Sequence, residues 1–266
     1  MGMAAQLRNI DDACEVIASF PEFKQLPIII GESDPEGCAA CRTARDAYRN
    51  GTMYSSYTAA VFPRKLEIAA KHGVNLEGAL SWAFEFEDQP PFAGFRQLAS
   101  AGLDLPVLNV FRMFGKMSGQ QVAVTSTAGL NAEIIRARNV REQADISAQA
   151  SLDEHKLSVL TWHYHDDDVP GPDAAISLEL DGIPFQNGDA TLTQYRIDAD
   201  HSNSFEAWKR LGSPQALSSE QYAQLEQAGK LAQLGGPVKV QVINGKARTN
   251  LQLPRHGVAL LILEWP

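Results

Sequence analysis

LPIIIGESDPEG, residues 26–37, decides the predicted fold of the first half of this chain. Apolar and proline residues run up to Gly31, which is typical of a strand buried on both faces, as in a parallel sheet. An acidic residue, Glu32, follows at once, and the turn-forming sequence DPEG comes soon after it. Because the carboxyl ends of parallel strands are where ligands bind, Glu32 is a candidate functional residue.

The segments around this stretch predict further βα units. Residues 9–115 alternate helical and strand-like segments, the pattern of a parallel sheet with helices on its faces. The predicted elements are a helix capped by Asn9, the strand Pro27–Gly31, a helix over Tyr54–His72, a strand over Gly78–Phe86 and a helix over Val107–Phe114. Pro63 should interrupt or restart the second helix.

A β-rich half begins after Gly115. Short segments there alternate apolar and polar residues, and NGKA at 244–247 is a hairpin signal. Two helical pieces, Ser204–Leu211 and Ser219–Ala232, interrupt them. We therefore predict an antiparallel β-sandwich over residues 116–266, and a fold class of α/β plus all-β.

Residues 1–115 contain too few strand and helix units to form a closed α/β domain. Two strand and helix units cannot close a barrel or cover both faces of a parallel sheet. Either this domain is unusually small, or the chain begins partway through a larger one. The opening residues, MGMAAQLRNIDDACEV, enter a predicted helix almost at once, which we interpret as an interior cut.

Composition excludes several classes of partner. The chain has 266 residues, of which 44% are hydrophobic and 21% charged, as in an ordinary globular protein. Its net charge of −9 argues against nucleic acid or a membrane as the partner, and a neutral or cationic ligand fits better. We expect no signal peptide and no membrane span, because no basic segment precedes a long apolar stretch. The compartment stays unknown.

Two groups of residues are of the types that bind metal ions. Cys38 and Cys41 form a CAAC sequence with no second pair and no nearby histidine, so a four-ligand zinc site cannot be completed locally. We interpret them as structural thiols, with a disulfide or redox role as the alternative. His163 and His165 alternate on a predicted strand and would point the same way, but the strand end explains them as well. We predict neither a metal nor a cofactor.

Aromatic and acidic side chains follow the second predicted strand. They are Trp82, Phe84, Glu85, Phe86, Glu87 and Asp88. Aromatic rings beside carboxylates suit a sugar, whose C–H faces stack and whose hydroxyls form hydrogen bonds. A carbohydrate enzyme is therefore our working hypothesis. In the alternative interpretation, Glu32 begins a solvated turn and Trp82 belongs to the core.

Four segments carry a resemblance to a known family. They are LPIIIGESDPEG, NGTMYSSYTA (50–59), LSWAFEFEDQPPFAGFRQLASAGLDLPVLNVFRMFGKM (80–117) and HSNSFEAWKRLGSP (201–214). In this order they resemble the C-terminal half of glycoside hydrolase family 39, the β-xylosidase group. The resemblance implies the last part of a (β/α)8 barrel over residues 1–115, followed by a β-sandwich over 116–266. It also implies hydrolysis of xylosides with retention, through a covalent glycosyl-enzyme intermediate.

The same resemblance implies roles for single residues. Glu32 matches the catalytic nucleophile at the end of the seventh barrel strand. Trp82 matches the aromatic residue that lines the sugar pocket after the eighth. Glu87 and Asp88 are the nearest match to the paired acids that bind sugar hydroxyls, although their spacing from Trp82 is shorter and the second acid is Asp. Glu85 could replace either.

The second catalytic carboxyl group of the family has no counterpart here. A retaining glycosidase needs two carboxyl groups about 5 Å apart. The family's acid/base is the Glu of an Asn-Glu-Pro motif on the fourth strand, and these 266 residues contain no such tripeptide. Roughly the first six strands are missing as well. We therefore expect a C-terminal fragment that is inactive alone.

Two alternatives stay open. The β-sandwich could make the chain a non-catalytic carbohydrate-binding or interaction module. The exposed edge of an incomplete barrel could also pair with a second copy or another chain, because uncovered strands carry unpaired backbone groups.

Overall fold

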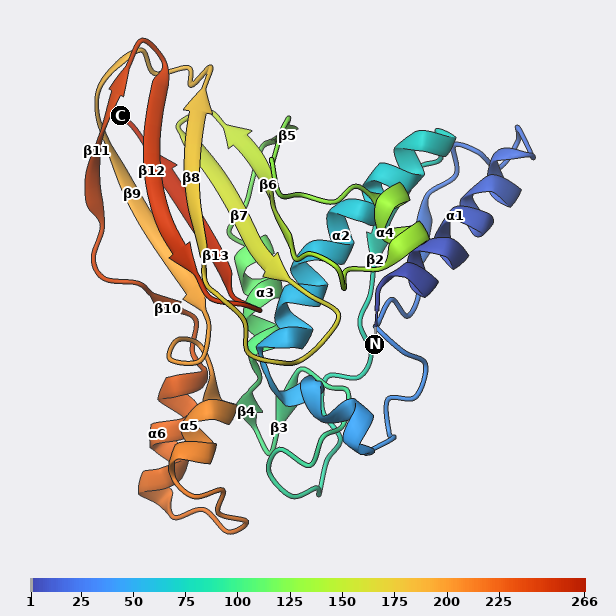
Figure 1. Cartoon of the computed structure of the whole chain (residues 1–266), viewed down its shortest axis with the longest axis vertical. Helices are drawn as coiled ribbons and strands as arrows, with labels where there is room; N and C mark the ends of the chain where they lie inside the picture. The colour runs from blue at the N-terminus through green and yellow to red at the C-terminus, as the bar shows by residue number, and fades with distance from the viewer. Residues whose placement is uncertain (1) are drawn as a thin grey trace.

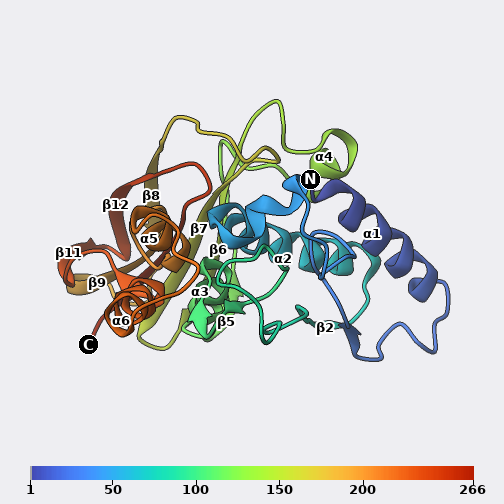
Figure 2. The same cartoon turned by 90° about the horizontal axis from the view of Figure 1, so that it is seen from below.

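One long helix, α2, lies between a pair of parallel strands and a large antiparallel sheet in the computed structural model, which describes residues 2–266 (Figures 1 and 2). The helices are α1 (Ala4–Ala18), α2 (Thr52–His72), α3 (Pro106–Phe114), α4 (Ala132–Arg138), α5 (Ser204–Arg210) and α6 (Ser219–Gly229), with the 3-10 helix η1 (Ala44–Asn50). The strands are β1 (Ile28–Ile30), β2 (Leu76–Ala79), β3 (Ala99–Ser100), β4 (Leu103–Asp104), β5 (Gln120–Val122), β6 (Asp145–Asp153), β7 (Lys156–Tyr164), β8 (Ala174–Asp181), β9 (Asn187–Ile197), β10 (Ala232–Gln233), β11 (Val238–Ile243), β12 (Lys246–Leu253) and β13 (Val258–Glu264).

The strands β1 and β2 form a two-stranded parallel sheet, and α2 connects them. This confirms the prediction of βα units in the first half. The prediction for the second strand, Gly78–Phe86, was wrong at both ends. The backbone bonds between the two segments end at Leu80, whose N–H donates to the carbonyl of Ile30 and whose carbonyl accepts from the N–H of Ser33, and β2 itself ends at Ala79.

Helix α2 is continuous, so the predicted interruption at Pro63 was wrong. Pro63 removes one backbone hydrogen bond, but it and its neighbours on either side, such as Val61 and Ile68, are packed in the core. Gly73 ends the helix, in the left-handed conformation with φ 64°. Helix α1 begins at Ala4, and Asn9 lies inside it rather than at its cap.

The second half is antiparallel, as predicted, and forms one continuous sheet. Its strands follow the order β5-β6-β7-β13-β9-β11-β12-β8, with β10 beside β9. Instead of two separate sheets, this single sheet curls so that β8 faces β6 and β7. The predicted hairpin joins β11 to β12 through Asn244 and Gly245, which both adopt positive φ.

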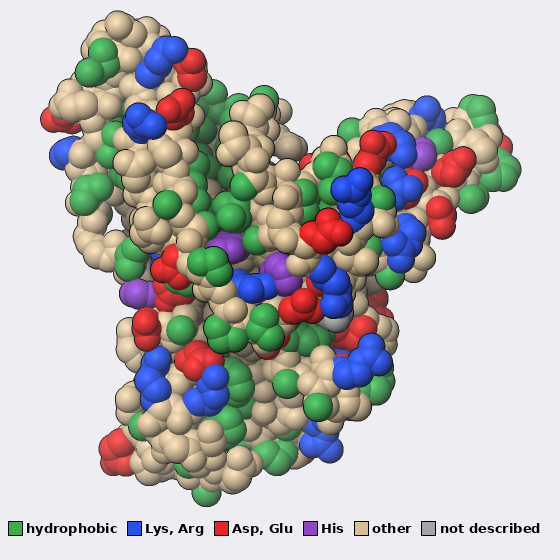
Figure 3. All heavy atoms as spheres, viewed as in Figure 1, with side chains coloured by type: hydrophobic (Ala, Val, Ile, Leu, Met, Phe, Trp, Pro, Cys, Tyr) green, Lys and Arg blue, Asp and Glu red, His purple; other side chains and the backbone are tan. Residues whose placement is uncertain are grey.

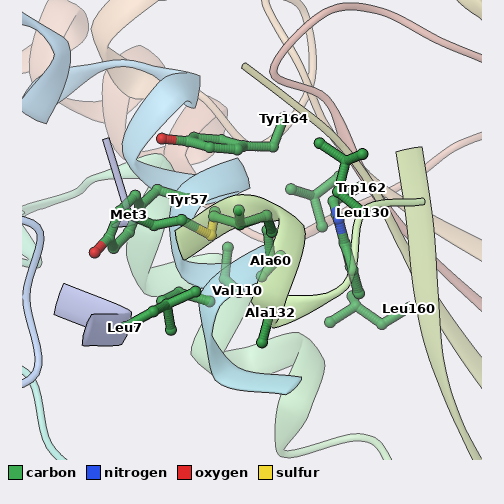
Figure 4. Close-up of a cluster of buried hydrophobic side chains, with 14 of the residues drawn as sticks. Met3, Leu7, Tyr57, Ala60, Val110, Leu130, Ala132, Leu160, Trp162 and Tyr164 are labelled. Atoms are coloured by element: carbon green, nitrogen blue, oxygen red, sulfur yellow. The ribbon is translucent and has the colours of Figure 1, made fainter. Parts of the chain in front are cut away.

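Two hydrophobic cores lie on opposite faces of the curled sheet. One fills the inside of the curl and includes Leu192, Leu251 and Leu261. The other packs the outer face of β7, β9 and β13 against α1, α2, α3 and α4, and Trp162 and Tyr164 lie there beside α2 (Figure 4). A third cluster joins α5 and α6 to the chain around β4. Helix α2 is thus held by the sheet on one side and supports the parallel strands on the other.

The surface is mixed in charge. On the face shown in Figure 3, basic side chains alternate with acidic ones along the arm formed by α1 and α4. Within residues 2–266, no helix has both the length and the apolar composition needed to cross a membrane.

Candidate active site

Glu32 and Trp82 lie at the same edge of the parallel strand pair. Glu32 is two residues beyond the end of β1, and Trp82 is three residues beyond the end of β2. The N–H of Ser33 donates to the carbonyl of Leu80 at 2.8 Å, which keeps the two chain segments together past the strands. The carboxyl ends of both strands therefore meet at the edge where the sequence placed a ligand site.

A buried arginine, Arg96, connects the two strand ends. Its guanidinium group forms an ion pair with the carboxylate of Glu32, and its Nε donates to the carbonyl oxygen of Trp82 at 3.2 Å. The Arg96 side chain is 0% exposed, whereas that of Glu32 keeps 45% of its surface exposed. Arg96 thus fixes one carboxylate oxygen of Glu32 and leaves the group accessible to a ligand.

A second carboxylate, Asp34, is fully engaged within the protein. It accepts hydrogen bonds from the hydroxyl of Tyr54 at 2.9 Å, the hydroxyl of Ser81 at 2.7 Å and the N–H of Trp82 at 3.0 Å. Its side chain is 2% exposed. Burial and the charge of Asp34 raise the pKa of Tyr54 well above its usual value, so the phenol stays protonated and donates. Asp34 therefore orients the chain around Trp82 and is unavailable as a nucleophile.

Lys65 of α2 lies beneath the end of β1. Its Nζ is 3.5 Å from the carbonyl oxygen of Ser33, and the residue is 1% exposed. Burial lowers the pKa of Lys65 to about 7, and the negative charge of Asp34 opposes that shift. The backbone just after β1 thus contacts the amine of Lys65, whose pKa lies near neutral pH.

The loop after β1 is closed by a disulfide between Cys38 and Cys41. The interpretation of these cysteines as structural thiols was wrong. The buried guanidinium group of Arg49 donates to the carbonyl of Cys38 at 2.7 Å and pairs with Glu36 at 2.7 Å. Burial raises the pKa of the Glu36 carboxyl group, and Arg49 opposes this effect. The side chain of Arg49 thus holds the backbone beside the cysteines, and the CAAC spacing alone does not establish that they form a disulfide.

Aromatic rings line one side of the site. Trp82 is 55% exposed, and its ring lies 6.1 Å from that of Phe86, nearly perpendicular to it. Phe86 in turn stacks on Phe95 at 4.7 Å. Because the indole of Trp82 is supported from one side and open on another, it can offer a face to a sugar ring.

The three other predicted sugar-binding acids lie in the chain that follows Trp82. Glu85 accepts a hydrogen bond from the N–H of Gly102 at 2.7 Å, in the turn between β3 and β4. Glu87 and Asp88 are exposed residues of the following turn. Within residues 2–266, no hydrogen bond or ion pair connects any of these carboxylates to Glu32. Their roles in binding stay predictions.

An apolar groove of about 580 Å³ opens beside Glu32. Ile10, Ala13 and Ile17 of α1 form one wall, while Ile30 and Leu76 form another. Glu32, Asp34, Glu36 and Arg96 lie at its end. The groove thus runs between α1 and the parallel strands to the carboxylate.

The histidines discussed above are structural. His163 Nδ1 lies 3.0 Å from the carbonyl of Leu253, and His165 Nε2 lies 2.9 Å from that of Arg141. Residues 2–266 contain no group of three or more His, Cys, Asp or Glu side chains placed to hold a metal ion.

Comparison with known families is decisive for the class of protein. The family model described as glycosyl hydrolases family 39 matches residues 2–241. The chain belongs to glycosyl hydrolases family 39. A search among curated proteins gives no match.

Several solved structures share the fold of this chain. A bacterial orthologue of human α-L-iduronidase superposes with a TM-score of 0.76 at 18% identity, covering 98% of this chain and 46% of that one. A family 39 enzyme from Xanthomonas axonopodis pv. citri gives 0.72 at 19% identity, covering 96% and 48%. A monomeric β-xylosidase from Caulobacter crescentus CB15 gives 0.69 at 18%, covering 98% and 50%. This chain thus spans about half the length of the structures that it matches.

Sequence reasoning missed three residues of this candidate site. Arg96 lies inside the segment 80–117 that carried the resemblance, but a single arginine after a turn is more often a surface charge. Asp34 was considered only as part of a turn, and Lys65 only as part of a helix. The signal that could have found Lys65 is its place on the apolar face of α2, where an unpaired lysine is rare.

Proposed function

We propose that this chain is the C-terminal part of a retaining glycoside hydrolase, a β-xylosidase that releases terminal β-D-xylose from xylo-oligosaccharides. The observation that supports this most is the accessible carboxylate of Glu32, held by the buried Arg96 at the end of a parallel strand. Glu32 would attack the anomeric carbon while a second carboxyl group protonates the leaving oxygen. Water would then hydrolyse the glycosyl-enzyme bond. Trp82, with Glu85, Glu87 and Asp88, would bind the sugar.

The proposal includes an incomplete barrel over residues 1–115 and an accessory β-sandwich over 116–266. Parallel strands are stable when both faces are covered, yet Ile29 of β1 is 59% exposed and Leu80 after β2 is 56% exposed. Further parallel strands and helices would cover these side chains. The match to about half of each solved structure agrees with this interpretation.

We propose that the chain alone does not turn over glycosides, because no Asn-Glu-Pro supplies an acid/base within its 266 residues. An aryl β-xyloside should therefore not be hydrolysed by the purified chain. Hydrolysis that disappears in Glu32→Ala would contradict this proposal.

The role of Glu32 can be tested without the missing acid. In 2,4-dinitrophenyl 2-deoxy-2-fluoro-β-xyloside, the phenolate leaves without protonation, so a nucleophile alone can be glycosylated. Peptide mass mapping should find the adduct on Glu32 and none in Glu32→Gln. Glu226→Gln, at an exposed residue of α6, is the matched control and should be labelled as the parent is. Labelling elsewhere, or none, would remove Glu32 as the nucleophile.

A carbohydrate-binding module is the second candidate. A groove of about 740 Å³ lies between β8 and residues 122–128, and the hydroxyls of Thr125, Thr127 and Ser177 line it. Titration of the full chain with xylo-oligosaccharides separates the two candidates. Loss of binding in Trp82→Ala supports the enzyme, while loss in Thr127→Lys with Trp82→Ala unchanged supports the module.

A further inference from the structure

The disulfide loop lies directly against the arginine that holds Glu32. The backbone N–H of Arg96 donates to the carbonyl of Ala39 at 2.9 Å, and Ala39 is inside the loop that Cys38 and Cys41 close. The guanidinium group of Arg96 also donates to the carbonyl of Glu36, just before the loop. One short segment thus fixes both the main chain and the side chain of Arg96.

A second buried arginine holds the same loop from η1. Arg49 donates to the carbonyls of Cys38 and Cys41, and its side chain is 0% exposed. Buried guanidinium groups are costly without acceptors, so both arginines depend on the shape of this loop. The disulfide fixes that shape, because it restricts the backbone of the residues between the two cysteines.

Solvent reaches the disulfide. Cys38 is exposed and Cys41 is partly buried, whereas the third cysteine, Cys14, is buried in α1. Thiol exchange depends on access to the sulfur that is attacked. A dithiol can therefore reach this bond while the core stays folded.

We propose that the Cys38–Cys41 disulfide is a redox-controlled positioning element for Glu32 and acts through Arg96. The inference rests on the proposed role of Glu32 as nucleophile. A thiolate of a dithiol attacks one sulfur and forms a mixed disulfide, and its second thiol then displaces the protein. Two electrons pass to the protein, the cysteines become two protonated thiols, and the dithiol becomes a disulfide. The freed loop no longer fixes Arg96, and the Glu32 carboxylate loses its orientation.

Hydrogen exchange on the full chain tests the link to Arg96. After reduction with dithiothreitol, confirmed by alkylation of two thiols, the amide of Arg96 should exchange about tenfold faster. The variant Cys38→Ser/Cys41→Ser should show the fast rate with or without reductant, and Cys14→Ala should respond as the parent does. Peptides covering β13 should not change. An unchanged rate at Arg96 in the reduced chain would overturn the inference.

Labelling of Glu32 by the activated fluoro-xyloside tests the effect on the carboxylate. Reduction should slow labelling about tenfold, and reoxidation should restore it. In Arg96→Met labelling should already be slow, and reduction should slow it no further, which a loop with a merely structural role would not produce. If reduction slowed the labelling of Arg96→Met by the same factor as that of the parent, the inference would be overturned. If oxidised parent is not labelled at Glu32 at all, the proposed function fails, while the exchange rate at Arg96 still decides the redox link.

Discussion

The central strands of the large sheet and the parallel strands are stabilised in different ways. In β13, Leu260 is 0% exposed, because α2 packs on one face of the sheet and the curl closes over the other. In β1, Ile29 is 59% exposed, and the strand end is held by buried charges such as Arg96 and Lys65. Apolar packing therefore fixes the sheet, while a polar network fixes the edge that carries Glu32. The two regions should respond to different perturbations.

The largest effect is expected from a cavity in the apolar region. Trp162 is 0% exposed and its Nε1 donates to Asp145 at 2.8 Å. Trp162→Ala should lower the free energy of unfolding by about 3–5 kcal/mol, measured by urea denaturation followed by circular dichroism. The matched change Trp82→Ala, at a residue 55% exposed, should cost less than about 1 kcal/mol. Equal losses would remove the distinction between the two regions.

The polar region should respond to pH through Lys65. Burial lowers the pKa of Lys65 to about 7, so between pH 7 and its usual 10.5 the unfolded chain binds a proton that the folded chain lacks. Stability from this group therefore rises with pH across that window, by about 1.4 kcal/mol per unit. Denaturation at two alkaline pH values should show the rise, and Lys65→Met should lack it. The exposed Lys71→Met is the control; a rise that persists without Lys65 would contradict the prediction.

A smaller effect is expected where a single polar contact supports a turn. Glu85 accepts one hydrogen bond from the N–H of Gly102. Glu85→Ala should cost about 1 kcal/mol, and hydrogen exchange at Gly102 should become faster. Glu87→Ala, in the exposed turn, should leave both quantities unchanged. If Glu85→Ala instead weakened sugar binding with no change at Gly102, Glu85 would belong to the sugar site.

The smallest effect is expected on the open face of β1. Ile29→Thr should change the free energy of unfolding by no more than about 0.5 kcal/mol, because Ile29 is 59% exposed. Sedimentation of the parent should show the same species at every concentration if this face stays uncovered. A large loss in Ile29→Thr, together with a concentration-dependent mass, would show that a second copy covers the strands.

The periodicity and turn residues of the sequence predicted the helices and strands well. They predicted poorly which contacts stabilise these elements. The strand ending at Gly31, the hairpin at Asn244 and the antiparallel second half follow from local patterns. Pro63 was misjudged because packing on both sides of α2 outweighs one lost hydrogen bond. Long-range packing of this kind leaves no signal in a local window of sequence.

Of the residues that meet at this edge, the sequence singled out Glu32 and Trp82, and their roles stay predictions. Glu32 stands out in the sequence because an acidic residue and a turn follow the apolar run that predicts a strand. The place of Arg96 depends on contacts between segments that meet only after folding, since Arg96 and Glu32 are 64 residues apart. A single sequence carries no record of such pairs.

The place of β13 in the sheet has a consequence for synthesis. This strand lies between β7 and β9, and Val258 pairs with Trp162 of a strand made far earlier. During translation, the edges of β7 and β9 that pair with β13 therefore stay unpaired until residues 258–264 leave the ribosome. Until then, the outer face that supports α2 lacks its middle strand. A chain that ends before Val258 would therefore carry β7 and β9 without the strand that joins them behind α2.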